Sequence, residues 1–232
     1  MKPEIFVDGP QPSEISGLVS EFKISGVTTN PSLMKGLGYT NYKDAIDGIV
    51  KASGELPVSV EVVSDNPRDV LHQGIEISKW SEHIAVKIPW MSSDGICLEN
   101  SIRELSSRGV PVNVTALLDP DHIERAVGCL DRTENSYVSV FAGRIADAGR
   151  SPIPIVSKAV ELANRRPGLK IIWASVREPY NFFDAESCGC HVITMQPMMI
   201  RKTLRFGLDL SAIEIETSQM FIEDAKKAGF KI

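Results

Sequence analysis

Short apolar runs of the kind that form buried strands alternate with longer amphipathic stretches along the whole chain. Eight runs are each followed by a candidate helix, and the expected strands are Glu4–Val7, Gly26–Thr29, Pro57–Val63, His83–Pro89, Pro111–Thr115, Tyr137–Phe141, Leu169–Ala174 and His191–Met195. This alternation predicts an α/β protein with a parallel sheet covered by helices. Eight units in 232 residues favour a closed (β/α)8 TIM barrel, with an open doubly wound sheet as the alternative.

The chain shows no internal boundary, because no linker, low-complexity tract or shift in composition divides it. We therefore expect a single barrel domain over residues 1–232, with a terminal helical extension over residues 210–232. Capping residues indicate two of the helix starts. Ser64 or Asp65 is expected to cap the helix that begins near Pro67, and Asp119 the helix that begins at Pro120.

The balance of charge argues against polyanionic partners. The chain has 25 Lys and Arg against 30 Asp and Glu, a net charge of −5, so we expect neither nucleic acid nor a membrane surface as the main partner. Arg144 and Arg177, unless they are ordinary surface arginines, can still give a phosphate bidentate contacts. No signal segment is recognised and no apolar run approaches the ~20 residues of a membrane span, so we expect a cytoplasmic protein.

The cysteines and histidines give no metal signature. No CxxC pair and no HxxxH spacing occurs among Cys97, Cys129, Cys188, Cys190, His72, His83, His122 and His191. Buried, reduced thiols are expected. Because glycine-rich nucleotide motifs are also lacking, we expect no metal and no cofactor.

Polar side chains gather at the C-terminal ends of the expected strands, where parallel barrels carry their active sites. They are Asp8, Thr28, Thr29, Asn30, Glu61, Lys87, Asn113, Thr115, Ser139, Arg144, Ser175 and Arg177. Asp8, Glu61 and Lys87 are ionisable, and burying such groups costs several kcal/mol each unless they pair or change protonation. One lysine near two carboxylates in a barrel mouth indicates a reaction centre.

Lys87 has a specific chemistry available to it. Desolvation favours the uncharged form of a buried lysine, and a free amine attacks a ketone to form a carbinolamine and then an iminium. The iminium is an electron sink, so the bond beyond the adjacent carbon can break. Asp8 or Glu61 can take the proton of the departing hydroxyl.

Each of these residues also has a purely structural interpretation. Lys87 can snorkel at a strand end or pair with a structural carboxylate. Asp8 and Asn30 each stand next to turn-forming residues, Gly9-Pro10 and Pro31. Glu61 can lie on an exposed strand edge, although its valine neighbours weaken that interpretation.

Five segments resemble the successive signatures of transaldolases and of the related fructose-6-phosphate aldolases. They are GVTTNPSL (Gly26–Leu33), VKIP (Val86–Pro89), VNVTALLD (Val112–Asp119), SVFAGRI (Ser139–Ile145) and ASVR (Ala174–Arg177). The matches occur in order and extend over most of the chain. The resemblance implies a Schiff-base barrel without cofactor that acts on sugar phosphates, typically in the pentose phosphate pathway.

The resemblance also implies a role for each matched residue. Lys87 would form the Schiff base and Asp8 would take the proton of the donor hydroxyl, while Glu61, with Thr115 and a water, would relay protons. The expected substrate-binding residues are Thr29, Asn30, Asn113, Ser139, Phe141, Arg144, Ser175 and Arg177. Of these, Asn30, Asn113 and Ser139 would hold hydroxyls of a dihydroxyacetone unit. Arg144, Ser175 and Arg177 would bind the phosphate.

Two positions favour transfer over simple cleavage. Fructose-6-phosphate aldolases carry Tyr where Phe141 stands and Gln where Glu61 stands. A tyrosine hydroxyl can help to protonate the enamine and release free dihydroxyacetone, whereas phenylalanine cannot. The resemblance therefore predicts a transaldolase that moves a dihydroxyacetone unit from a ketose phosphate to an aldose phosphate.

The chain departs from the family after the lysine, where Lys87–Gly95 is one residue longer than usual and lacks a threonine. Ser92 or Ser93 can replace the missing hydroxyl, but the bulky Trp90 and Met91 should change the pocket wall. Three alternatives stay open: an unusual sugar phosphate of a specialised pathway, a lyase, and a catalytically silent barrel. Short family members form rings through the terminal helix, which implies a homo-oligomer, a pentamer or decamer.

Overall fold

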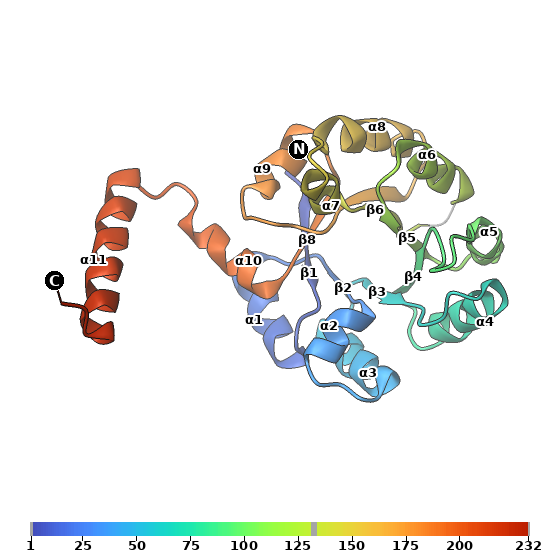
Figure 1. Cartoon of the computed structure of the whole chain (residues 1–232). Coiled ribbons are helices and arrows are strands. Elements are labelled where there is room, and N and C mark those ends of the chain that lie inside the picture. Colours follow the sequence, from blue (N-terminus) through green and yellow to red (C-terminus); the bar gives the residue numbers. More distant parts are fainter. Residues whose placement is uncertain (1, 131–133, 232) are drawn as a thin grey trace. The chain divides into compact units, whose positions relative to one another are not determined.

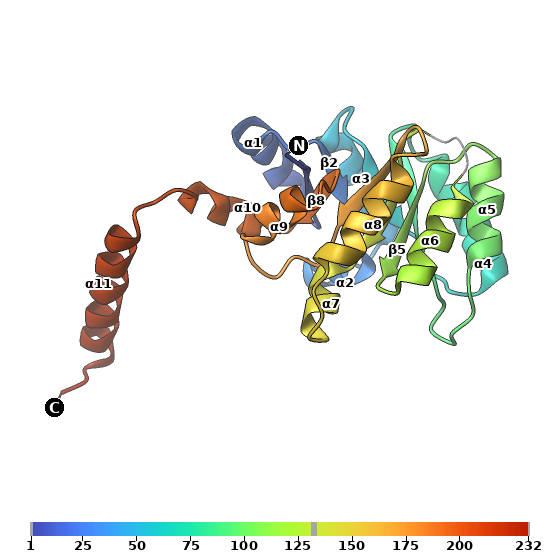
Figure 2. The same cartoon turned by 90° about the horizontal axis from the view of Figure 1, so that it is seen from above.

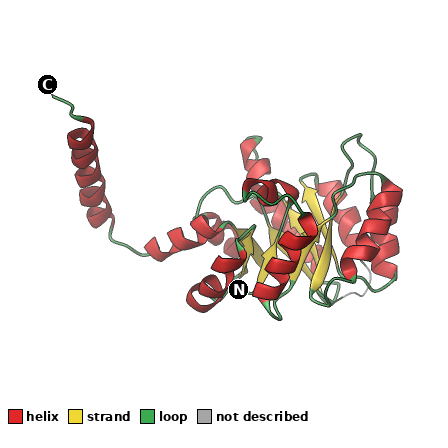
Figure 3. Cartoon of the chain, turned by 90° about the horizontal axis from the view of Figure 1, so that it is seen from below, coloured by secondary structure: helices red, strands yellow, loops and turns green. Residues whose placement is uncertain are grey.

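The computed structural model describes residues 2–130 and 134–231. Its first compact unit, Met1–Ile200, contains a closed barrel of eight parallel strands that follow one another in chain order, with β8 pairing to β1. Figure 1 shows the ring of strands with helices around it, and Figure 3 shows the strands enclosed by helices. The strands are β1 (Glu4–Asp8), β2 (Gly26–Thr28), β3 (Val58–Glu61), β4 (Ile84–Pro89), β5 (Val112–Leu117), β6 (Ser136–Val140), β7 (Leu169–Trp173) and β8 (Val192–Met195).

The predicted barrel is confirmed, and the predicted strand boundaries differ from the observed ones by at most two residues. The open doubly wound sheet is excluded because the strands close on themselves. Around the barrel lie α1 (Pro12–Phe22), α2 (Pro31–Gly36), α3 (Tyr42–Ser53), α4 (Pro67–Ser78), α5 (Glu99–Ser107), α6 (Pro120–Cys129), α7 (Ala142–Asp147), α8 (Ile153–Ala163), α9 (Asn181–Ser187) and α10 (Pro197–Lys202). Figure 2 shows several of these helices running beside the strands.

The helix starts follow from local capping chemistry. Asp119 caps α6 as predicted, and its carboxylate accepts from the first backbone N–H groups of that helix. The expected cap of α4 was wrong: Asn66 caps it by accepting from the backbone of Arg68, while Ser64 accepts from the backbone of Asn66. Asp65 instead contacts Ser93 of another loop. An asparagine directly before the proline was therefore the better signal.

The barrel interior is built in layers. An apolar cluster of Phe6, Ala85, Tyr137, Ile172, Ala174 and Val192 fills part of it, with the rings of Phe6 and Tyr137 packed edge to face at 5.6 Å. Side chains at i and i+2 of a strand point to the same face. Asp8, Lys87 and Ser139 each stand two residues beyond a member of this cluster, so they belong to the next interior layer. The apolar layer thus forms the floor under the polar one.

The second compact unit, Arg201–Ile232, contains the short 3-10 helix η1 (Thr203–Arg205) and the 19-residue helix α11 (Leu210–Ala228). Asp209 caps α11 by accepting from the backbone of Ser211, and Gly229 ends it in the left-handed conformation that glycine tolerates. None of its described side chains is buried. Its exposed large apolar side chains are Leu210, Ile215, Met220, Phe221 and Ile222.

Among the described residues, no helix has both the length and the apolar character needed to cross a membrane.

Gly26 offers a test of the barrel packing, because a Cβ there would lie 2.5 Å from the ring of the buried Phe6. We expect Gly26→Ala to lower the free energy of unfolding by about 1–3 kcal/mol, and Phe6→Leu to relieve part of that loss in the double variant. Gly17→Ala is the control, since nothing lies within 4 Å of its Cβ, and it should be neutral or stabilising. Denaturant unfolding measures all three, and equal effects at the two glycines would contradict this packing.

Candidate active site

A cavity of about 200 Å³ opens at the C-terminal ends of the strands. Nine of the twelve predicted catalytic and binding residues line it: Asp8, Asn30, Lys87, Thr115, Ser139, Phe141, Arg144, Ser175 and Arg177. The other three are Thr29, Glu61 and Asn113. The backbone carbonyl of Thr29 accepts from Lys87, Glu61 forms an ion pair with Lys87, and Asn113 accepts from Ser139. A larger surface hollow of about 810 Å³, between α6 and α8, is lined by none of the predicted residues. Chemistry rather than size therefore identifies the candidate site.

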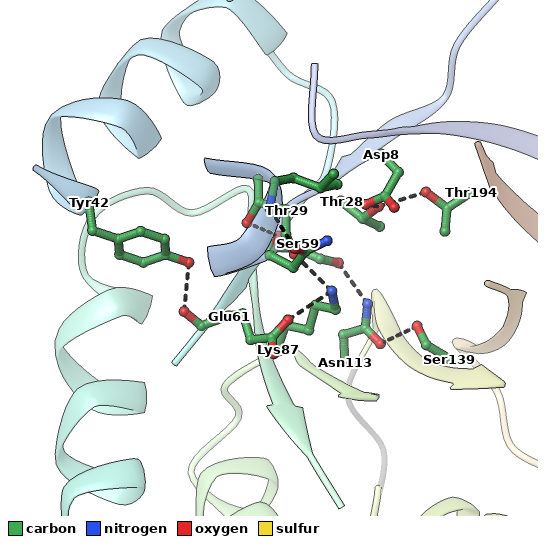
Figure 4. A network of polar contacts seen from close by, with 12 residues as sticks. Asp8, Thr28, Thr29, Tyr42, Ser59, Glu61, Lys87, Asn113, Ser139 and Thr194 are labelled. Atoms are coloured by element: carbon green, nitrogen blue, oxygen red, sulfur yellow. Dashed lines mark hydrogen bonds and ion pairs between the residues drawn. The ribbon is translucent and has the colours of Figure 1, made fainter. Parts of the chain in front are cut away.

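Lys87 lies at the centre of the site and is only 5% exposed. Its Nζ donates to the backbone carbonyl of Thr29 at 2.8 Å and lies 2.9 Å from Oε2 of Glu61 (Figure 4). The pairing follows from the register of the sheet, which places Glu61 of β3 beside Lys87 of β4. A buried amine in contact with a carboxylate has a proton acceptor in place when it must become a nucleophile.

Glu61 is held in position by Tyr42, a residue that the sequence did not single out. The hydroxyl of Tyr42, on α3, donates to the backbone carbonyl of Glu61 at 2.7 Å. Burial raises the pKa of Tyr42 to about 12, so the hydroxyl stays protonated and keeps donating at neutral pH. No sequence signal indicated this contact, because it joins a helix to the end of a strand 19 residues away.

Asp8 faces the same cavity from β1, and its Oδ1 accepts from the hydroxyl of Thr28 at 2.8 Å. Burial raises the pKa of Asp8 above the usual value of an aspartate. The charge of Lys87 and the Thr28 hydrogen bond pull that pKa down, and Glu61 adds to the rise. A carboxylate with a raised pKa is a stronger base than a solvent-exposed one, which suits proton abstraction.

The amide of Asn113 is oriented from both sides. Its Nδ2 donates to Oγ of Ser59 at 2.9 Å, and its Oδ1 accepts from Oγ of Ser139 at 2.7 Å. Asn113 is completely buried behind the cavity wall, whereas Ser139 lines the cavity. Ser59, two residues before Glu61 on the same face of β3, could have been found by strand alternation.

Thr115 lines the cavity with a hydroxyl that is free to bind. Its Oγ1 is buried and has no hydrogen-bond partner among the residues that the structure describes. Buried hydroxyls are normally satisfied, so an orphan that faces a cavity marks a place for a water or a substrate oxygen.

Thr29 and Asn30 contribute to the site through different groups, the backbone of Thr29 and the side chain of Asn30. The hydroxyl of Thr29 donates to the backbone carbonyl of Ser59 at 2.9 Å, so its contact with Lys87 is made by its backbone. Asn30 caps α2 by accepting from the backbone of Leu33 at 2.9 Å and also lines the cavity. Asn30 therefore has the structural role of a cap and also lies where the predicted substrate contact would be made.

Arg144, Ser175 and Arg177 form the cationic part of the wall. The backbone at the start of α7 approaches the segment after β7 closely there: a Cβ on Gly143 would lie 1.7 Å from the carbonyl oxygen of Ser175, which itself has a φ of 64°. Only glycine permits this approach. The guanidinium of Arg177 also pairs with Asp147 through two hydrogen bonds. Asp147 therefore orients this side chain and balances its charge from outside the cavity.

The longer segment after Lys87 folds away from the cavity. Met91 and Cys97 form an isolated antiparallel bridge, Oγ of Ser92 accepts from the backbone of Ile96, and Ser93 contacts Asp65. Neither serine lines the cavity, so the structure does not place the expected replacement hydroxyl in the pocket wall.

Trp90 is buried in the core, and its ring lies under the guanidinium of Arg125 at 5.3 Å. Its bulk is thus absorbed by the packing outside the cavity. Within residues 2–130 and 134–231, no group of three or more His, Cys, Asp and Glu side chains is arranged to hold a metal ion.

Comparison with known proteins agrees with the fold and the motifs. The crystal structure of a "putative phosphonomutase" from Burkholderia cenocepacia superposes with a TM-score of 0.54 at 14% identity over 92% of this chain and 94% of that one, which is a likeness of fold alone. Two proteins named "Probable transaldolase" are closer in sequence. The one from Nitrosopumilus maritimus is 33% identical over 91% of both chains, and the one from Thermoanaerobacter sp. is 31% identical over 99% of this chain and all of its own.

The family model described as Transaldolase/Fructose-6-phosphate aldolase matches residues 5–232. That match includes all the residues of the cavity described above. The chain therefore belongs to the transaldolase/fructose-6-phosphate aldolase family.

Proposed function

We propose that the protein is a transaldolase, which transfers a dihydroxyacetone unit from a ketose phosphate to an aldose phosphate through a Schiff base on Lys87. The observation that supports this most is the position of its amine, buried 2.9 Å from Glu61 in the layer that also presents Asp8. Arg144 and Arg177 line the same cavity and suit the phosphate of either sugar.

Formation of the Schiff base begins with a proton transfer from Lys87 to Glu61, which exposes the amine. The amine attacks the carbonyl carbon of the ketose to form a carbinolamine. Glu61 then returns its proton to the departing hydroxyl, which leaves as water, and the iminium remains. The hydroxyl of Thr115, which has no hydrogen-bond partner among the described residues, would hold that oxygen.

Cleavage then needs a base on the hydroxyl next to the breaking bond. Asp8 accepts this proton, the electron pair of the carbon–carbon bond moves into the iminium to give an enamine, and an aldose phosphate leaves. In the reverse direction the enamine attacks the carbonyl carbon of an acceptor aldose phosphate, while Asp8 returns the proton to the new hydroxyl.

Phe141 supports transfer rather than release of free dihydroxyacetone. Its ring lines the cavity without a hydroxyl, and the guanidinium of Arg144 lies 5.3 Å from the ring centre. The wall at this position therefore has no proton donor that could quench the enamine before an acceptor binds.

We further propose that the chain forms a homo-oligomer, a pentamer or decamer, through its terminal helix. The support is that α11 buries none of its described side chains and exposes five large apolar ones, with Leu210 75% and Phe221 63% exposed. Apolar surface of this kind on a helix is typical of a contact with another subunit.

The Schiff base can be tested by reduction with borohydride in the presence of fructose 6-phosphate. Mass spectrometry should find a reduced three-carbon adduct on Lys87. Lys87→Met should abolish both the adduct and transfer, with a loss of about 10⁴-fold or more. Lys79→Met, at an exposed lysine on the outside of the barrel, is the matched control and should keep both. An adduct on another lysine, or none in the wild type, would refute the proposal.

The role of Phe141 predicts that Phe141→Tyr shifts the reaction toward cleavage. Release of free dihydroxyacetone without an acceptor should rise about tenfold, because the new hydroxyl can help to protonate the enamine. Phe183→Tyr, at a partly exposed ring on α9, is the control and should not change the partition. An unchanged ratio of release to transfer in Phe141→Tyr would contradict this assignment.

The phosphate site predicts a selective effect of Arg144→Ala and Arg177→Ala. Each should raise KM for fructose 6-phosphate by about 10–100-fold, because a charge-assisted hydrogen bond to phosphate is lost, and should leave the slow reaction of unphosphorylated fructose unchanged. Arg150→Ala, at an exposed arginine just beyond α7, is the control. Equal losses with both donors would show that these arginines do not bind the phosphate.

A further inference from the structure

The two oxygens of the Asp8 carboxylate have different surroundings. Oδ1 accepts from the hydroxyl of Thr28 at 2.8 Å, whereas Oδ2 has no hydrogen-bond partner among the described residues. The hydroxyl of Thr28 in turn lies 2.6 Å from that of Thr194 (Figure 4). These three side chains form a chain of two short hydrogen bonds.

Sheet closure brings the three residues together from distant parts of the sequence. In the barrel β1 lies between β2 and β8, so that Asp8 pairs with Thr28 on one side, while Phe6 pairs with Thr194 on the other. Thr28 is 1% exposed and Thr194 is 4% exposed, so bulk water does not compete for their hydroxyls. Both also line the cavity that holds Asp8.

The direction of the hydrogen bonds follows from the number of protons. An ionised carboxylate only accepts, so the single hydroxyl proton of Thr28 must point to Asp8. The oxygen of Thr28 is then the acceptor in its contact with Thr194, and Thr194 must be the donor. The chain therefore runs from Thr194 through Thr28 to Oδ1 of Asp8, and each bond polarises the next.

We infer that Thr194 and Thr28 are positioning residues that fix the Asp8 carboxylate and leave its Oδ2 as the atom that takes the substrate proton. This inference rests on the proposed transaldolase reaction. In the cleavage step the proton passes from the substrate hydroxyl to Oδ2, and the electrons of its O–H bond form the new carbonyl. The electrons of the broken carbon–carbon bond move into the iminium.

The ionisable groups around Asp8 determine how the loss of the Thr28 hydrogen bond would change the pKa of Asp8. It faces Lys87 from β4 and Glu61 from β3, and Arg144 and Arg177 line the same cavity from the loops after β6 and β7. Burial raises the pKa of Asp8, and the Thr28 hydrogen bond lowers it. Loss of that bond raises the pKa further, so the acidic limb of the rate profile should move to higher pH.

A double-mutant cycle tests the inference. Thr28→Val should lower kcat about tenfold and move the acidic limb of kcat/KM up by about one pH unit, because it removes a hydrogen bond to a carboxylate. Thr194→Val should lower kcat about threefold with little change in KM, because it acts only through Thr28. In the Thr28→Val background, Thr194→Val should therefore have no further effect on kcat.

Conservative variants separate this role from general packing. Thr194→Ser keeps the hydroxyl and should restore kcat to near the wild-type value, although it removes a methyl group. Ser53→Ala, which deletes a buried hydroxyl bonded within α3, is the control and should leave kcat and the pH profile unchanged. The inference is overturned if the two valine substitutions reduce kcat independently, or if the acidic limb does not move in Thr28→Val.

Borohydride trapping distinguishes this failure from failure of the proposed function. The threonine variants should still form a reduced adduct on Lys87, either with the intact six-carbon ketose phosphate or with the three-carbon unit that remains after cleavage, because the Schiff base forms before Asp8 acts. Adduct formation in every variant without coupling of the two threonines would overturn only the positioning role of Thr28 and Thr194. No adduct even in the wild type would overturn the transaldolase proposal as well.

Discussion

The contact between Lys87 and Glu61 is the constraint on which the rest of the site depends. A lysine at 5% exposure inside a barrel is tolerated only when its charge is compensated, and the register of β3 against β4 places the carboxylate 2.9 Å from the amine. Two further groups hold this pair: the backbone carbonyl of Thr29 accepts from the amine, and Tyr42 donates to the backbone carbonyl of Glu61. Asp8 adds a second carboxyl group whose pKa is lowered by the charge of Lys87 and raised by that of Glu61. The proposed reactivity of Lys87 depends on the same arrangement, because a compensated amine has its proton acceptor already in contact.

The site can be this polar because the layer beneath it is not. Phe6, Ala85 and Tyr137 fill the interior two residues below Asp8, Lys87 and Ser139, so the barrel is stabilised by packing at one level and carries its ionisable groups at the next. Two glycines permit the close contacts that this arrangement of layers and loops requires. Gly26 makes room for the Phe6 ring, and Gly143 lets the start of α7 touch the segment after β7 that carries Ser175 and Arg177.

Much of the fold could be predicted from the sequence, because buried parallel strands are apolar, short and separated by amphipathic helices. The site followed from position alone: polar residues at strand ends of a closed barrel must meet. Two residues of the site escaped prediction for different reasons. Tyr42 contacts Glu61 through one hydrogen bond between elements far apart in the chain, and no local pattern marks it. Thr194 lies in the expected strand His191–Met195, so the strand-end rule applied to it as well and could have found it. The six-residue helices α2 and α7 come in addition to the one candidate helix expected after each strand, and six residues are too few to show a helical period. The segment after Lys87 was misjudged because its extra length is taken up by a bridge between Met91 and Cys97 that sequence spacing does not reveal.

The proposed reaction requires that the amine of Lys87 becomes covalently attached to the carbonyl carbon of a ketose phosphate inside this cavity. A crystal structure of the protein soaked with fructose 6-phosphate would reveal this bond. We expect continuous electron density from Nζ of Lys87 to the second carbon of the sugar, with the nearest hydroxyl on Oδ2 of Asp8 and the phosphate between Arg144 and Arg177. A sugar bound without a covalent link, or bound with its phosphate away from both arginines, would contradict it.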